Sequence, residues 1–424
     1  MPIGMVSTGT WSGNELRDSY DSILWRLYPQ SDIPLTTYLA RGKKRKQDNA
    51  EYRYWSKTAQ TQCGALTGKY EESTLTTAYG AGDTAAAGAE VHCKVAAATV
   101  AHFRVGHVAA LVCSTNLTQQ VFGIVTAVST NGANSRISLR LLKAATAGYI
   151  YNADYIDIIG DANAEGAARP DSLTYAATEL SNYTQIFRQA VLMSRTQMRT
   201  PLEYGDAYQE ERAEQQYYHA QQREMAAYFG EKTKTTDPAT GKPLRTTQGA
   251  VPFLVEHASD NCFNYVTESE LSWLQGGDGW LDEKLEVLFR YGGQERLAIC
   301  GSGCLLGIDQ LVKQNGSYQL AEGTTTWGLK VVKWKTPFGV LNLKKSGLFT
   351  VKSFRRYAML VLDPANIGTR TFEPTQYQTG PELRKGGEIG IDGMIGEWLT
   401  EEGFEWHFPE TMGYFEGVGL DGAA

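Results

Sequence analysis

The sequence predicts an α+β protein, and three features of its 424 residues support this prediction. A long polar helix is expected from Asp206 to Phe229, because neither Pro nor Gly occurs between these residues. Short β-branched runs between Gly80 and Gly160 are typical of a small all-β module. Beyond Ala250, helical and strand-like segments mix without the strict alternation that builds a parallel sheet.

The composition indicates an ordinary soluble globular chain. Hydrophobic residues make up 42% and charged residues 21% of the sequence, and the formal net charge is −7. This negative balance argues against a chain that binds polyanions over its whole surface. No apolar run is long enough to cross a bilayer, and the first residues lack the basic start and apolar stretch of a signal peptide. We therefore expect a soluble protein made in the cytosol.

The long helix is expected to lie across a surface and to dock through a narrow stripe. Residues 200–203 (TPLE) have the spacing of a capping box, and Gly230 stands where a left-handed C-terminal cap would need it. Such a helix spans about 35 Å at about 1.5 Å per residue. The expected stripe consists of Tyr218, Met225 and Phe229, and a second row of Ala213, Tyr217 and Ala220. The charged residues Glu210, Glu211, Arg212, Glu214 and Arg223 are expected to point elsewhere.

The N-terminal third begins with a predicted short amphipathic helix. Residues 12–15 (SGNE) offer a capping box, and the apolar residues that follow at helical spacing are Leu16, Tyr20, Ile23, Leu24 and Leu27. The partner of this arm is either its own domain or another surface. The basic run at 41–46 predicts a solvated hairpin edge, with a nucleic-acid site as the alternative. Residues 51–56 predict a strand with Tyr52 and Tyr54 on one face.

The β-rich module and the segments around it follow from turn signals and apolar runs. Strands are expected at 95–100, 108–112, 121–128, 137–142 and 155–159. Residues 161–178 read as a polar return and 232–247 as a loop.

The region after residue 250 predicts a second compact body. Thr267 and Glu270 are expected to cap a helix that is interrupted at 276–279, and Gly292 to close it. The apolar stripe of its second part comprises Leu281, Leu285, Leu288 and Phe289. A buried strand is expected at 297–300, a helix at 305–313, and further strands at 331–334, 340–343 and 357–362. Residues 370–424 return to β-type alternation.

The sequence contains no pattern that we assign to catalysis, to a cofactor or to a metal. The cysteines Cys63, Cys93, Cys113, Cys262, Cys300 and Cys304 contain no Cys-x-x-Cys pair, so free thiols are expected. The histidines His92, His102, His107, His219, His257 and His407 show no ligand spacing.

One turn offers an alternative in the enzyme class. Gly301, Gly303 and Gly307 lie between a predicted strand and a predicted helix, and Glu322 follows about 20 residues on, as in a dinucleotide-binding turn. The spacing is one residue too long for that fingerprint, and close helix–strand packing also explains the glycines. Ser302 is not a nucleophile elbow, because cysteines stand where that motif needs glycines.

Several segments, in order, resemble a family of tailed-phage major capsid proteins. They are NYTQIFR at 182–188 with the long helix after it, RLAICGS at 296–302, WGLKV at 327–331, TPFGVLNL at 336–343 and LDPAN at 362–366. The resemblance covers roughly residue 34 to the C-terminus.

This resemblance implies the Hong Kong 97-type fold. The implied parts are an N-terminal arm (1–40), an extended loop (41–178) with a β-rich insertion at about 80–160, and a peripheral domain (179–249) with the spine helix at 206–229. An axial domain (250–366) and a return to the peripheral domain (367–424) complete it. It also implies no enzymatic activity and no cofactor.

The implied function is that of a structural protein of the virion, assembled in the host cytoplasm. Copies would form hexamers and pentamers of an icosahedral head that encloses double-stranded DNA without sequence specificity. A separate scaffolding protein, a portal and a decoration protein are the expected partners. The alternatives are the shell of an encapsulin-like nanocompartment and a nucleotide-binding enzyme that uses the Gly301–Gly307 turn.

Overall fold

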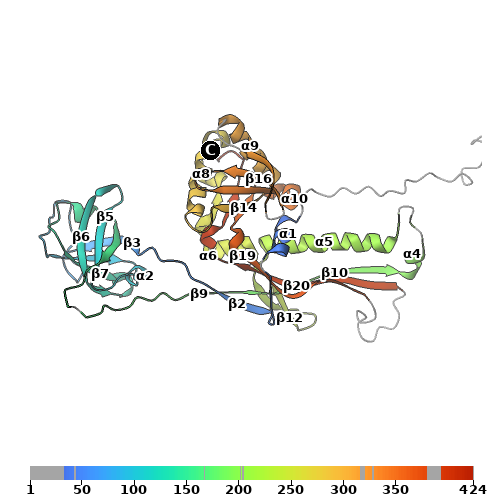
Figure 1. Ribbon diagram of the computed structural model, residues 1–424, viewed down its shortest axis with the longest axis horizontal. Coiled ribbons are helices and arrows are strands. Elements are labelled where there is room, and N and C mark those ends of the chain that lie inside the picture. Colours follow the sequence, from blue (N-terminus) through green and yellow to red (C-terminus); the bar gives the residue numbers. More distant parts are fainter. Residues whose placement is uncertain are drawn as a thin grey trace, which may run out of the picture. The chain divides into compact units, whose positions relative to one another are not determined.

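The computed structural model describes residues 33–423 except 43, 167, 201, 203–204, 316–319, 327–328 and 380–392 (Figure 1). The helix expected at 16–27 lies outside these residues, as do parts of the 200–203 capping box and of the 327–331 segment. The chain divides into two compact units, residues 57–178 and the remainder. Each unit is described by itself.

The unit of residues 57–178 is built on a closed six-stranded barrel in the order β3-β4-β7-β6-β5-β8. Its elements are β3 (Cys63–Tyr70), β4 (Glu90–Val95), α2 (Ala97–Val100), β5 (His107–Cys113), β6 (Asn116–Ser129), β7 (Arg136–Leu141), α3 (Tyr149–Asn152) and β8 (Tyr155–Asp161). Val91, Cys93, Ile137, Leu139 and Ile156 are fully buried at its centre. The all-β character matches the sequence prediction, but the barrel begins earlier, at β3.

The strand expected at 95–100 is wrong. β4 ends at Val95, whose N–H donates to the Ser135 carbonyl, and α2 follows as one helical turn. This turn brings Val100, which is 4% exposed, into the barrel core.

In the other unit, a four-stranded sheet has the order β1-β19-β20-β10. Its strands are β1 (Lys44–Lys46), β19 (Ile367–Thr379), β20 (Gly393–Trp406) and β10 (Gln185–Ser194). β1 pairs parallel to β19, so the basic run forms a sheet edge instead of the predicted hairpin edge. All three β1 side chains are exposed.

The long helix α5 (Ala207–Phe229) lies along this sheet (Figure 1). The helix itself was predicted, but both of its ends differ from the prediction. Asp206 is the N-cap and accepts hydrogen bonds from the N–H groups of Tyr208 and Gln209. Gly230 is extended (φ −62°, ψ 134°), not left-handed. A Cβ there would lie 2.5 Å from the Thr247 carbonyl oxygen, so space and not backbone freedom requires the glycine.

The buried face of α5 matches the predicted apolar stripe only in part. Met225 and Phe229 pack against the core as predicted, whereas Tyr218 is 41% exposed. The fully buried residues of the helix are His219, Glu224, Ala227 and Tyr228. Arg223, expected to point elsewhere, pairs with Glu402 of β20 at 2.7 Å. The sheet supplies polar partners to this face, which is why polar side chains can be buried there.

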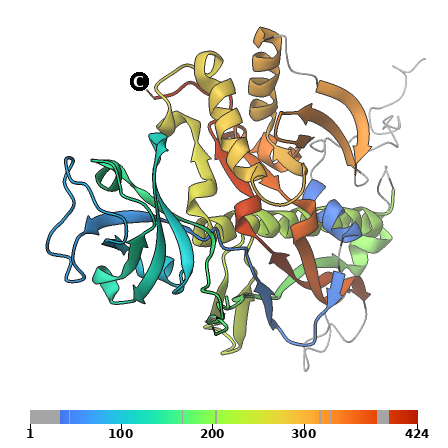
Figure 2. The same ribbon diagram turned by 60° about the vertical axis from the view of Figure 1, so that its left-hand side comes forward.

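A seven-stranded sheet in the same unit has the order β13-β21-β18-β14-β17-β16-β15 (Figure 2). Its strands are β13 (Cys262–Asn264), β21 (Gly413–Glu416), β18 (Met359–Leu362), β14 (Glu295–Cys300), β17 (Val340–Lys345), β16 (Leu329–Lys335) and β15 (Leu320–Thr326). Successive residues of its central strands enter two different cores: Leu297 and Ile299 one, Ala298 and Cys300 the other. Both faces of the sheet centre are therefore covered.

Helices supply both covers. α8 (Trp273–Phe289) and α9 (Ser302–Asn315) contribute to one core. α1 (Pro34–Arg41), α6 (Ala250–His257), α10 (Gly347–Val351) and the end of α5 contribute to the other. The predicted stripe of α8 is confirmed, since Leu281, Leu285 and Leu288 are fully buried and Phe289 packs against them.

The start of α8 and the end of the chain differ from the sequence predictions. α8 begins after Ser272 and runs through the glycines where an interruption was predicted. Gly277 lies against the Trp273 ring, where a Cβ would approach to 2.7 Å. The preceding turn α7 (Tyr265–Glu268) is capped by Asn264 and not by Thr267. β21 pairs with β18, so residues 413–416 belong to the seven-stranded sheet, although the whole stretch 367–424 was expected to return to the peripheral domain.

Smaller elements complete this unit. β2 (Glu51–Ser56) and β9 (Thr178–Tyr183) pair with each other, and β11 (Thr233–Thr236) and β12 (Pro243–Thr246) form a hairpin where a loop was predicted. α4 (Arg195–Arg199) precedes α5. Tyr52 and Tyr54 are both buried, as the alternation predicted.

Candidate functional site

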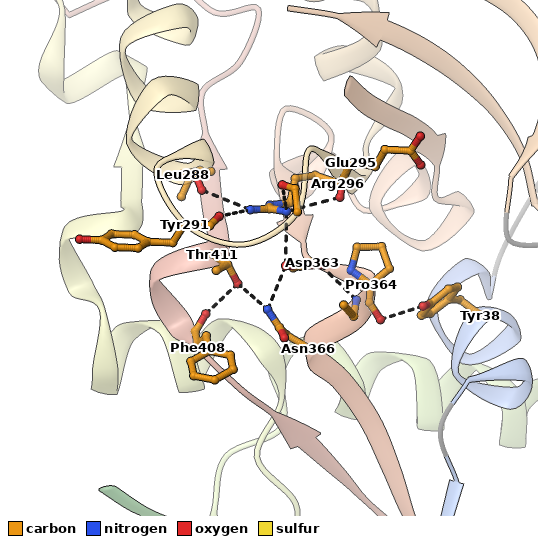
Figure 3. A network of polar contacts seen from close by, with 12 residues as sticks. Tyr38, Leu288, Tyr291, Glu295, Arg296, Asp363, Pro364, Asn366, Phe408 and Thr411 are labelled. Carbon is orange, nitrogen blue, oxygen red and sulfur yellow. Dashed lines mark hydrogen bonds and ion pairs between the residues drawn. The ribbon is translucent and has the colours of Figure 1, made fainter. Parts of the chain in front are cut away.

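Two of the segments that carried the family resemblance meet in a buried ion pair (Figure 3). Nη1 of Arg296, at the start of β14, lies 3.3 Å from Oδ2 of Asp363, and the two side chains are 0% and 4% exposed. The guanidinium also donates to the carbonyl oxygens of Gly293, Tyr291 and Leu288 after α8 and near its end. Burial lowers the pKa of Arg296, and the Asp363 carboxylate opposes that shift.

Asp363 fixes the short link through which the chain leaves the seven-stranded sheet for the four-stranded one. It accepts hydrogen bonds from Ala365 N at 3.1 Å and from Asn366 Nδ2 at 2.9 Å (Figure 3). The Tyr38 hydroxyl of α1 donates to the Pro364 carbonyl at 2.9 Å. The joint between β18 and β19 is thus held from β14 and from α1, and we call residues 363–366 the sheet link.

Asn182 forms a second buried node. Its Nδ2 donates to Thr247 Oγ1 at 3.2 Å, to the Gln248 carbonyl at 3.3 Å and to the Phe404 carbonyl at 2.9 Å. Its Oδ1 accepts from Gln248 N and from Tyr183 N, each at 2.8 Å. An amide is suited to this position because it combines two donor hydrogens with an acceptor oxygen. β9, the segment before α6, and β20 are joined through this one side chain.

A third node holds β2 against β20. The Tyr52 hydroxyl donates to the Phe404 carbonyl at 2.6 Å, and Trp406 N donates to the Tyr54 hydroxyl at 3.4 Å. Beside them Glu405 binds Arg370 at 2.6 Å and His407 at 2.7 Å. Burial alone would raise the pKa of Glu405, but these hydrogen bonds and charges lower it to about 2.

Glu224 ties α1 to α5. Its carboxylate accepts from Leu35 N at 2.8 Å and from Thr36 N at 2.6 Å, the first free N–H groups of α1, and also from the Tyr228 hydroxyl. Burial raises the pKa of Glu224, and these hydrogen bonds oppose the shift.

The glycine-rich turn is occupied by the protein itself. The N–H groups of Gly303 and Cys304 both donate to the Arg356 carbonyl, at 3.0 and 3.1 Å. A Cβ at Gly301 would lie 2.2 Å from that same oxygen, and one at Gly307 would lie 2.4 Å from the Gly419 Cα. The donors that would cradle a phosphate are used and the space is filled. Helix–strand packing accounts for these glycines, and this geometry speaks against the nucleotide-binding alternative.

Three further features of the described residues concern metal ions, cysteines and membranes. No group of three or more His, Cys, Asp or Glu side chains in this part of the chain could hold a metal ion. All six cysteines are free thiols, as predicted, and Cys93, Cys113, Cys300 and Cys304 are buried. Within the same residues, no helix has the length and apolarity to cross a membrane.

The nodes hold two sheets, a long helix and the start of α1 together. The chain belongs to the SU10 major capsid protein family, whose model matches residues 5–419. The predicted membership in a phage major capsid family is thus confirmed, and the protein is a component of the virion.

Individual relatives are more distant. The major capsid protein of Pseudomonas phage PaMx41 is 24% identical over 300 residues, which cover 68% of this chain and 71% of that protein. The structure of Mycobacterium phage Bobi has a TM-score of 0.45 at 7% identity, covering 97% of this chain and 99% of that one. The SrpI encapsulin of Synechococcus elongatus has a TM-score of 0.39 at 8% identity, covering 57% and 76%. The family assignment rests on the match across residues 5–419.

Proposed function

We propose that copies of this chain assemble as hexamers and pentamers into the icosahedral head of a tailed phage, enclosing its double-stranded DNA. The observation that carries the proposal is the family match across residues 5–419. The architecture supports it, because every buried polar node serves to fix the shape of the subunit. A subunit of fixed shape can make several modest contacts whose effects add up when a shell closes.

In this proposal the parts follow the Hong Kong 97-type plan. Residues 1–40 are the N-terminal arm, 41–178 the extended loop with its β-rich insertion, and 179–249 the peripheral domain with the spine helix. Residues 250–366 are the axial domain, and 367–424 return to the peripheral domain, except that β21 pairs back into the seven-stranded sheet. The pairing of β2 with β9 supports this plan, since the strands that lead into and out of residues 57–178 lie side by side.

The proposal also assigns the partners. The subunit acts without catalysis, and a separate scaffolding protein, a portal and a decoration protein complete the head. Packaged DNA lies against the inner face without sequence-specific contacts, and the net charge of −7 limits its adhesion to the wall. Assembly takes place in the host cytoplasm. Closed, uniform shells formed by the purified chain alone would contradict the need for a scaffolding protein.

The extended loop provides the direct test. Residues 57–178 are replaced by a short Gly-Ser linker between β2 and β9, and the variant is expressed with the other head genes of its phage. We expect a folded subunit with a cooperative thermal transition and no closed shells in electron micrographs. The matched control inserts the same linker at the exposed turn of Gly132 and leaves the barrel in place. Shells of normal size from the deletion variant would refute the role of the loop.

A further inference from the structure

The hairpin β11–β12 carries a pair of like charges with no counter-charge. Lys234 and Arg245 are direct cross-strand partners, and Lys234 is exposed. Among the described residues, no carboxylate forms an ion pair with either side chain. Like charges that face each other across two strands destabilise the pairing, and an isolated two-stranded hairpin is only marginally stable in water. An anionic surface that covers the basic face of this hairpin would therefore stabilise its strand pairing.

The four-stranded sheet presents the opposite pattern on the face away from α5. Glu373 of β19 and Glu401 of β20 are direct cross-strand partners. Each accepts one hydrogen bond from a neutral donor, from Gln376 and Thr184 respectively, and neither has an ion-pair partner within the described part of the chain. Arg188, the cation of this face, is already bound to Glu397.

The acidic pair lines a shallow groove of about 530 Å³. Ile186 and Phe372 also line the groove and are 57% and 38% exposed. The aliphatic stems of a lysine and an arginine can cover such apolar side chains while their charged ends reach the carboxylates. The groove thus matches the basic hairpin both in charge and in its mixture of apolar and polar surface.

We propose that the β11–β12 hairpin of one copy docks on this sheet face of a second copy, with Lys234 and Arg245 against Glu373 and Glu401. The inference rests on the proposed function, because it needs a shell in which copies touch. Both pairs lie in the same compact unit, but within the described part of one copy no ion pair joins Lys234 or Arg245 to Glu373 or Glu401. In this proposal a second copy supplies the missing partners. Each repulsive pair is a cost in the free subunit that the contact removes, which favours assembly over the monomer.

The contact is head-to-tail, and this gives a decisive experiment. One variant carries K234E and R245E, and a second carries E373K and E401K. Each alone places like charges at every contact, so we expect the shell yield of each to fall at least about tenfold by sedimentation and electron microscopy. An equal mixture of the two restores opposite charges wherever unlike copies meet, so we expect it to give a higher yield of particles than either variant alone. The matched control, K242E, reverses a charge outside the proposed pairs on the same hairpin and should assemble normally.

A second measurement uses the unsubstituted protein. Particles are grown from a mixture of ¹⁴N- and ¹⁵N-labelled copies and treated with a zero-length carbodiimide cross-linker. Peptides that join Lys234 to Glu373 or Glu401 with mixed labels support the contact between copies, whereas same-label peptides alone place it within one copy and overturn the proposal.

Three other outcomes would each overturn one of the two proposals. If K234E/R245E forms full-yield shells that package less DNA, the hairpin binds nucleic acid and the proposal is wrong. Full-yield shells with normal DNA content overturn it as well. Wild-type protein that forms no multi-copy particle with its head genes refutes the proposed function itself, a result that is distinct from charge variants which assemble normally.

Discussion

The two large sheets of this subunit are buried in different ways. In the seven-stranded sheet, all four residues of β18 are buried, as are the last five of β14. In the four-stranded sheet, β10 alternates: Phe187 and Val191 are buried against α5, whereas Ile186 and Leu192 are 57% and 63% exposed on the other face. Among the described residues, one sheet is covered on both faces, whereas the other is covered by α5 on one face and carries exposed apolar side chains on the opposite face.

The ion pairs of the two sheets differ in the same way. The side chains of Arg296 and Asp363 are 0% and 4% exposed, but those of Arg188 and Glu397 are 59% and 11% exposed. The first pair stabilises the subunit only as long as both charges are present, because neither can reach water. The second is partly solvated and costs little to lose. We therefore expect the stability of the subunit to depend more on the first pair than on the second.

The largest expected effect on stability comes from removing the cation of the buried ion pair. Arg296→Met leaves Asp363 charged, buried and unpaired, so we expect the free energy of unfolding to fall by about 3–5 kcal/mol in urea denaturation of the subunit. The matched control Arg188→Met removes the exposed partner and should cost less than about 1 kcal/mol. Equal losses in the two variants would show that the sheets do not differ in this respect.

The next effect concerns the apolar side chains. Leu360→Ala opens a cavity in a strand that is covered on both faces and should cost about 2–5 kcal/mol. Ile186→Ala removes an exposed side chain and should change the stability of the isolated subunit by less than about 0.5 kcal/mol. The same Ile186→Ala variant should assemble less well than wild type in sedimentation. An Ile186 variant that unfolds as readily as the Leu360 variant would mean that this face is covered within the subunit.

A third prediction uses pH. Burial, followed by the neighbouring Arg223, lowers the pKa of His219 to about 4, below the value of about 6.5 in an unfolded chain. The unfolded state therefore binds the proton first, and the stability that neutral His219 contributes is lost as the pH falls from about 6.5 to about 4. Glu405, with its pKa lowered to about 2, adds a further loss below about pH 4.5.

The measurement for this third prediction is the melting temperature as a function of pH. His219→Gln, which retains a donor for Thr400, should give a flatter curve between pH 6.5 and 4, and His257→Gln, at an exposed position on α6, is the control. An unchanged slope in His219→Gln would assign the pH dependence to other groups.

The smallest expected effect on stability concerns Gly230, which follows the last residue of α5. Gly230→Ala places a Cβ 2.5 Å from the Thr247 carbonyl oxygen and 2.6 Å from that of Ala226. We expect a loss of about 1–3 kcal/mol from the forced backbone shift. Gly160→Ala, whose Cβ would meet nothing within 4 Å, should stay within about 0.5 kcal/mol of wild type. If Gly230→Asn proved better tolerated than Gly230→Ala, the glycine would be required for a left-handed cap and not for space, and our account would be wrong.

Periodicity predicted those elements whose partners are apolar. The β14 strand, the leucine stripe of α8 and the buried pair Tyr52 and Tyr54 follow from local spacing alone. Asp206 could also have been recognised, since an Asp directly before an uninterrupted helical run is a strong N-cap.

The polar face of α5 could not be predicted in this way. His219 is buried and Arg223 is partly buried because Thr400 and Glu402 lie opposite them, about 180 residues further along the chain. The same limit applies to Arg296, whose partner Asp363 lies in the sheet link, 67 residues further along the chain. Local sequence shows that such a side chain is charged, but only the tertiary fold shows whether a counter-charge is present.

The sheet link has a mechanical consequence. Between Leu362 and Ile367 the chain passes from one sheet to the other through a single 3-10 turn, Pro364–Asn366, whose polar groups are bound to Asp363 and Tyr38. Such a joint has no slack. A torque applied to the larger sheet would therefore be passed to the smaller sheet through this turn.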